Sequence, residues 1–355
     1  MKALAIMLAS AVMAFGYGYW DSFDLGARIP SLSAVSGGMC GATVPDPSSA
    51  LSVFVNPSAL AASSNVVVSA SGWYLGWREE ISYHYTCIEP YRYNIGSMIP
   101  RGAFAFAVPL GRGFTAGAGV STVSQYQMKA IVQEYYEITP THRELWNTMF
   151  TDAYGNISEA LVSLAGVAGP VSIGISPGVR FGSGGSTTYA NSVFGQSSSS
   201  VISWKHSGFA LRAGASITLG CTVLYSTHTT GDHRYLSFTN LGASSSLAIM
   251  NGGYLGAEIG VLDGDNLNVT AFTRLPGAIE GSNMYMGVNG YRPDDALKAG
   301  IGLSIGGDYS FENYRVSAAY HFHSRYREGT AVPVRYINHV YDAGDLLIVG
   351  VERSF

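Results

Sequence analysis

The stretch VSIGISPGVRFG, residues 171–182, decides the fold class. Apolar side chains, one of them a proline, occupy every second position, and Ser, Gly and a single Arg occupy the positions between them. The apolar set comprises Val171, Ile173, Ile175, Pro177, Val179 and Phe181. A repeat of two residues is the period of a β-strand, whose successive side chains point to opposite faces. The stretch therefore predicts a strand with one apolar face and one face of small or polar residues.

The same alternation recurs along most of the chain. It is found at residues 104–108, 209–219, 255–261, 267–271, 297–305 and 314–322. The second face is again Gly, Ser and Thr, and only four of the 20 Lys and Arg residues are lysine, whereas a solvated sheet face uses lysine freely. Apolar residues facing lipid and small polar residues facing a lumen are typical of a membrane barrel, whose strands need about 9–11 residues to cross. We therefore predict an all-β, transmembrane, antiparallel up-and-down β-barrel of about 14 strands, in preference to a soluble β-sandwich.

Composition excludes several other classes. The chain of 355 residues is 47% hydrophobic but only 12% charged, about half the charge of a typical soluble domain. Beyond about residue 15 no apolar run reaches the roughly 20 residues of a membrane helix, which excludes a polytopic helical protein. The net charge of −4 offers no basic surface, so no nucleic-acid partner is expected.

The connections between strands predict two different rims. Short turns are expected at residues 110–113 and 169–170, and long loops at 128–155 and 183–203, which matches the periplasmic and extracellular ends of a barrel. Residues 143–150 are predicted to form a short helix over the mouth, where Trp146 and Phe150 would capture a hydrophobic ligand. Trp73 and Trp77 are assigned to aromatic girdles at the membrane interfaces.

Both ends of the chain indicate export to an outer membrane. Lys2 followed by the apolar residues 3–15 predicts a secretory signal peptide over residues 1–18. The alternating last strand ends on Phe355, which resembles the C-terminal signature of bacterial outer-membrane barrels and implies recognition by the barrel-assembly machinery. We expect the outer membrane of a Gram-negative-type bacterium, with its lipid as a partner. Cys40 and Cys87 could form a disulfide, or all three cysteines could be unpaired.

Residues 37–61 carry a more specific signal. A Gly- and Ala-rich stretch with Gly38 and Gly41 is followed by Asp46 and then by Asn56-Pro57-Ser-Ala-Leu-Ala. This region resembles the N-terminus of the FadL/PorV-type outer-membrane proteins, although Ser58 and Ala59 replace the usual Ala-Gly. The resemblance implies a 14-stranded barrel from residue 63 to 355 with a hatch, residues 19–62, folded inside it. A plain turn into the first strand is the other interpretation of Asn-Pro.

The resemblance also implies a function. It predicts a channel for passive uptake of small hydrophobic molecules, such as fatty acids or hydrocarbons; the alternative is a PorV-like accessory or carrier protein for secretion-system partners. Inward charged and polar residues would line the lumen and hold the hatch, or merely solvate the interior. These candidates are Arg180, Arg212, Arg274, Arg315, His321, His323, Glu258 and Glu352.

No catalytic, metal or cofactor site is predicted. Gly174-Ile-Ser176-Pro-Gly178 matches a nucleophile-elbow pattern, but that pattern needs a sharp turn into a helix and here it lies in an alternating strand. His321 and His323 share a face, yet no third ligand for a metal is evident. The sequence therefore favours a protein that is not an enzyme.

Overall fold

The computed structural model describes residues 27–28, 31–83, 101–139, 142–192, 197–231, 237–246, 253–262, 266–291, 297–328 and 337–355. The predicted signal peptide, Cys87 and therefore a Cys40–Cys87 disulfide lie outside these residues. No helix within the described ranges is long and apolar enough to cross a membrane.

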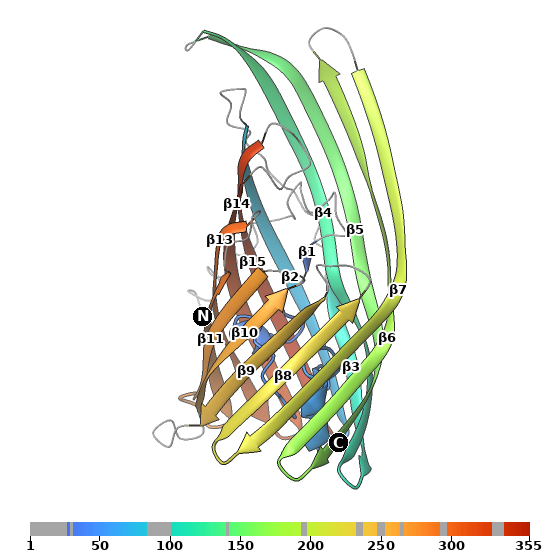
Figure 1. The fold of residues 1–355 in the computed structure, drawn as a ribbon, viewed down its shortest axis with the longest axis vertical. Helices are drawn as coiled ribbons and strands as arrows, with labels where there is room; N and C mark the ends of the chain where they lie inside the picture. Colours follow the sequence, from blue (N-terminus) through green and yellow to red (C-terminus); the bar gives the residue numbers. More distant parts are fainter. Residues whose placement is uncertain are drawn as a thin grey trace.

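Fourteen antiparallel strands of the described chain form a closed barrel (Figure 1). They are β2 (Val67–Tyr83), β3 (Arg101–Gly111), β4 (Phe114–Thr139), β5 (His142–Ala168), β6 (Val171–Ser192), β7 (Ser197–Leu219), β8 (Thr222–Gly231), β9 (Phe238–Ser246), β10 (Tyr254–Leu262), β11 (Asn266–Pro276), β12 (Ser282–Tyr291), β13 (Leu297–Phe311), β14 (Tyr314–Glu328) and β15 (Ile337–Ser354). Each strand pairs with its neighbours in the chain, and β15 closes the ring on β2. The predicted up-and-down barrel and its strand number are confirmed.

The alternation in the sequence matches the two faces of this sheet. On β6, Ile173, Ile175, Val179 and Phe181 are exposed on the outside, whereas Ser176 and Arg180 are fully buried on the inside. Closure is what makes such a surface tolerable in lipid, because each strand of the ring pairs with a neighbour on both sides. The wall is therefore that of a membrane-spanning barrel.

The short turns predicted for one rim are present, whereas two of the long loops predicted for the other rim are replaced by strands. β3 and β4 are joined by a tight turn at 112–113, and β5 and β6 by Gly169-Pro170, where Gly169 has a φ of +59°. The predicted long loops at 128–155 and 183–203 are wrong, because β4 to β7 continue through most of these residues and rise above the rest of the barrel (Figure 1). The predicted helix at 143–150 is also wrong, since these residues pair with β4 as part of β5.

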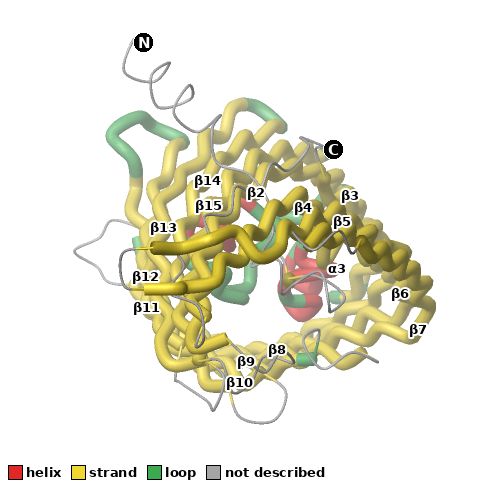
Figure 2. The backbone as a smooth tube through the Cα atoms, turned by 90° about the horizontal axis from the view of Figure 1, so that it is seen from above, coloured by secondary structure: helices red, strands yellow, loops and turns green. Residues whose placement is uncertain are grey.

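The described part of the chain before β2 lies inside the barrel (Figure 2). It contains β1 (Ala27–Arg28), which pairs with β4, and the helices α2 (Ala34–Gly38), α3 (Ser52–Val55) and η2 (Pro57–Ala62), the last a 3₁₀ helix. Viewed from above, these helices lie within the ring of strands (Figure 2). We call residues 31–63 the luminal segment.

Candidate functional site: the luminal segment and its contacts with the wall

The luminal segment has its own apolar core against the wall. Leu51, Phe54 and Leu60 are almost completely buried and belong to one cluster with the wall residues Ile157 and Leu161. Ile157 and Leu161 point inward on β5, so the segment packs directly against apolar side chains of the wall. Trp73 belongs to the same cluster and is only 4% exposed. Its assignment to an aromatic girdle is therefore wrong, since it points inward.

Asn56 and Pro57 organise the second half of the segment. The Asn56 side chain is fully buried; its Oδ1 accepts hydrogen bonds from the Ser58 N–H (3.2 Å) and the Ser58 hydroxyl (2.7 Å), and so caps η2. Pro57 stands in the first turn of that helix, where its missing N–H costs nothing. The Asn56 amide donates to the Thr43 carbonyl at 2.9 Å. Asn-Pro is thus more than a turn into the first strand, because it joins the two halves of the segment.

The C-terminal end of α2 packs directly against a glycine of the wall, Gly306 on β13. A Cβ on Gly38 would come within 3.2 Å of Gly306 Cα on β13. The hydroxyl of Ser304, on the same strand, donates to the Gly38 carbonyl and accepts from the Cys40 N–H, both at 2.8 Å. The chain then reverses through left-handed conformations, with φ of +55° at Cys40 and +80° at Gly41. Burial raises the pKa of the Cys40 thiol to about 11.

The side chain of Glu258 on β10 accepts hydrogen bonds from the middle of the luminal segment. Its Oε2 accepts from the Thr43 N–H at 2.7 Å and from the Thr43 hydroxyl at 2.8 Å. Thr227 on β8 donates to the same hydroxyl at 3.2 Å. A buried carboxylate needs such donors, because an ionised group without partners is costly to bury.

Arg315 on β14 binds a carboxylate of the segment. Its guanidinium contacts Asp46 at 2.9 Å, and also Asp308 on β13 at 2.8 Å and Glu352 on β15 at 3.1 Å. Ser48 accepts from the same guanidinium and donates to Asp46. Burial alone would raise the pKa of Asp46, but the charge of Arg315 and the hydrogen bonds from Ser48 and Arg315 hold it below its ordinary value.

A second charged cluster lies on the opposite side of the wall. Glu159 on β5 is fully buried and forms ion pairs with Arg180 on β6 and with Arg212 on β7, the latter at 2.8 Å. Arg212 also donates to the Phe54 carbonyl of the luminal segment. Glu159 is thus paired within the wall, and Arg212 links this cluster to a backbone carbonyl of the segment.

The remaining lumen candidates also face inward, but the described contacts do not tie them to the segment. Arg274 lies over the ring of Tyr254, with 5.9 Å between its Cζ and the ring centroid. The rings of His321 and His323, both buried, are 5.7 Å apart. No group of three or more His, Cys, Asp or Glu side chains in the described residues could hold a metal ion.

The two ligand-capture candidates do not line the mouth as a helix would have placed them. Phe150 is 41% exposed and shares a strand face with Tyr154, which continues the outer surface. Trp146 lies in the part of β5 that pairs with β4, and its side chain is outside the description.

Three residues that carry the site were not predicted from the sequence. Glu159 was hidden because its inward neighbours Ile157 and Leu161 are apolar, so neither face of that strand stretch looked polar. Asp308 shares the inward face of Ser304, and this spacing could have revealed it. Thr43 carried no signal, because a lone threonine outside a strand has many roles.

The fold and the site define a class: a membrane-spanning β-barrel with a folded N-terminal segment anchored inside it. No protein-family model matches the sequence, and no curated protein matches it. Solved structures do match. The toluene transporter TodX of P. putida aligns with 12% identity and a TM-score of 0.59, over 94% of this chain and 99% of that one. The toluene transporter TbuX of Ralstonia pickettii aligns with 13% identity and a TM-score of 0.54, over 94% and 100%.

A deltaS2 mutant of the TodX monoaromatic hydrocarbon channel gives a TM-score of 0.64 at 12% identity, over 91% of this chain and 98% of that one. At these identities the likeness establishes the fold. The FadL-type architecture that the N-terminal motif predicted is thus confirmed as a fold.

Proposed function

We propose that the protein is an outer-membrane channel for passive passage of small hydrophobic molecules, with the luminal segment as its hatch. The observation that carries the proposal is how the segment is attached. In the described residues its backbone hydrogen bonds are internal, and its bonds to the wall involve side chains such as Ser304, Glu258 and Arg315. Such a segment can move without breaking the strand pairing of the barrel.

The inner wall favours a hydrophobic cargo. Besides its charged clusters, it carries aromatic and aliphatic side chains that pack against the luminal segment and would line the lumen if the segment moved. These are Trp73, Tyr225, Phe272, Tyr285, Leu346 and Ile348. Binding sites for apolar small molecules combine such a lining with a few placed polar groups. The structurally similar TodX and TbuX are toluene transporters, which supports the same class of cargo here.

Uptake tests the proposal directly. The protein is expressed in a Gram-negative host that lacks its own channel of this fold, and uptake of radiolabelled toluene and oleate is measured at limiting concentration. We expect faster uptake of at least one of them than in cells carrying an empty vector. Faster entry of a hydrophilic solute of similar size, such as glycerol, with toluene and oleate unchanged would contradict the proposal.

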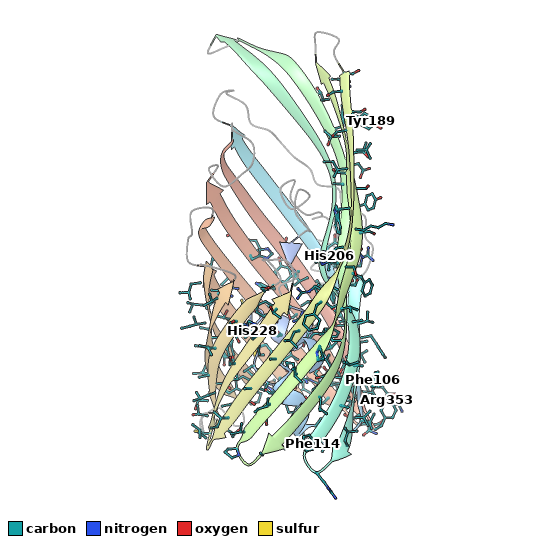
Figure 3. The ribbon with its side chains drawn as sticks, turned by 45° about the vertical axis from the view of Figure 1, so that its right-hand side comes forward. Phe106, Phe114, Tyr189, His206, His228 and Arg353 are labelled. Carbon is teal, nitrogen blue, oxygen red and sulfur yellow. The ribbon has the colours of Figure 1, made fainter. Side chains whose placement is uncertain are left out.

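The projecting hairpins favour a second candidate, a PorV-like carrier or accessory protein in secretion. β6 continues 11 residues beyond Phe181, and apolar residues are exposed at this height, with Val201 75% and Tyr189 55% exposed. Tyr189 lies near the top of the projecting strands (Figure 3). Exposed apolar surface of this kind indicates binding to proteins. Co-purification of specific exported proteins, lost when residues 133–148 are replaced by a short Gly linker, would support this candidate over the channel.

A further inference from the structure

The outer face of β5, β6 and β7 changes character at one level. Residues paired across antiparallel strands lie side by side, so the register defines rows. One row is Ser158–Phe181–Ser207, and the next row away from the short turns is Asn156–Ser183–Lys205. Toward the turns the following rows are apolar, beginning with Ala160–Val179–Phe209. The unbroken run of apolar rows therefore ends at Phe181, and Tyr154, Val201 and Tyr189 are exposed again in rows beyond it.

This level matches the edge of a membrane. From Val171 to Phe181 the strand advances about 33 Å, which at a tilt of about 45° is about 23 Å of height. The lipid-facing band of a membrane barrel is about 25 Å tall. Phe181 thus marks the upper end of the hydrocarbon, and the Asn156–Ser183–Lys205 row lies at the height of headgroups. The short turns form the periplasmic rim, so these headgroups belong to the outer leaflet.

The surface is hollowed at this place. A cavity of about 470 Å³ is lined by the six residues of the two rows together with Gly182 and His206. Figure 3 shows His206 at the height where β6 and β7 rise above their neighbours. The hollow arises because three of the six outward side chains are serines, while Phe181, 46% exposed, forms its apolar side.

The chemistry of the lining selects an anionic amphiphile. Lys205 is exposed and forms no ion pair within the described part of the chain. An ammonium group offers three hydrogen-bond donors as a compact charge, which suits a phosphate. The serine hydroxyls and the Asn156 amide add neutral donors around it. Below them, Phe181 and Val179 offer a path for an acyl chain.

We propose that this hollow binds the phosphate of an outer-leaflet lipid, with an acyl chain of that lipid lying along β6. The lipid would sit where the projecting hairpins leave the membrane and would fix their height above it. The proposal rests on the outer-membrane location in the proposed function but not on transport. Absence of lipid binding at this hollow would not change the expected uptake of toluene or oleate. Absence of uptake would not change the expected lipid binding.

Native mass spectrometry of the full-length protein tests it, with diphosphoryl lipid A as the probe. We expect one lipid A to bind more tightly than the rest, and its dissociation constant to rise about tenfold in Lys205→Gln, the effect of one lost charge-assisted contact. Arg353→Gln is the matched control, because Arg353 stacks on Phe355 at the opposite rim. It should bind lipid A as the wild type does.

A second variant and a competition with inorganic phosphate complete the test. Ser183→Leu fills the hollow and leaves Lys205 in place, and it should weaken lipid A binding while the heat-modifiable gel mobility of the barrel is unchanged. Equal lipid A affinity in wild type and Lys205→Gln would overturn the proposal. Displacement of lipid A by an equal concentration of inorganic phosphate would also overturn it, because the site would then bind free anions rather than a lipid.

Discussion

Two sides of the inner wall hold the luminal segment in different ways. On the β5–β7 side, Glu159 pairs with Arg180 and Arg212 of the wall, and Arg212 also reaches the segment at the Phe54 carbonyl. This cluster would stay paired if the segment left. On the β13–β15 side, Arg315 is shared between two wall carboxylates and Asp46 of the segment itself. Departure of the segment would break an ion pair there, so in the proposed hatch this side is the latch and the other side is a seat.

The largest expected effect separates the latch from the seat. Arg315→Met leaves Asp46, Asp308 and Glu352 without their shared cation, a loss of about 3–5 kcal/mol, and should release the segment. Arg212→Met leaves Glu159 paired with Arg180 and should have at least a tenfold smaller effect. The measurement is the maleimide labelling rate of Cys40 in a Cys87→Ser background.

Cys40 is suited to report release. It is 3% exposed, and its pKa of about 11 lies about two units above an ordinary thiol, so roughly 100-fold fewer molecules carry the reactive thiolate. Cys221, exposed in the turn between β7 and β8, provides an internal reference. Equal acceleration of Cys40 labelling by both substitutions would remove the distinction between latch and seat.

A smaller effect concerns Asp46 and pH. Its pKa is lowered in the docked state, so its carboxylate stabilises docking above the ordinary aspartate pKa of about 3.9 and loses this contribution as pH falls through the lower docked value. This contribution of Asp46 predicts that single-channel conductance in planar bilayers rises as pH falls below about 4. Asp46→Asn should show a raised conductance already at neutral pH, but less than Arg315→Met, because Arg315 keeps two partners. A conductance step near pH 6 that persists in Asp46→Asn would assign the latch to another group.

The sequence was sufficient to predict the barrel wall, but not the contacts of the segment inside it. Alternation predicted the wall because a strand in lipid must present one apolar face, and the same parity placed Arg180, Arg212 and Arg315 inside. The girdle assignment failed for Trp73 because it used residue type alone, whereas Trp73 lies inside β2 on the same inward face as Ser69 and Ser71. Alternation did not predict the strands within 128–155, because the sequence there lacks the period of two although β4 and β5 continue through most of it. The partners of Asp46 and Thr43 could not be predicted, since they depend on long-range closure of the barrel.

Locking the segment to the wall tests the central claim most directly. Ser58 and Ser216 have their hydroxyls 3.2 Å apart, one on the segment and one on β7. Ser163 on β5 and Ser176 on β6 are 2.9 Å apart within the wall and provide the matched pair. Each pair is changed to cysteine in a background with the three native cysteines replaced by serine, and toluene uptake is measured before and after reduction. The hatch account predicts that the oxidised Ser58→Cys/Ser216→Cys protein stops uptake until it is reduced, while the Ser163→Cys/Ser176→Cys protein is active in both states. Undiminished uptake through the oxidised Ser58→Cys/Ser216→Cys protein, with its disulfide verified by mass, would contradict it.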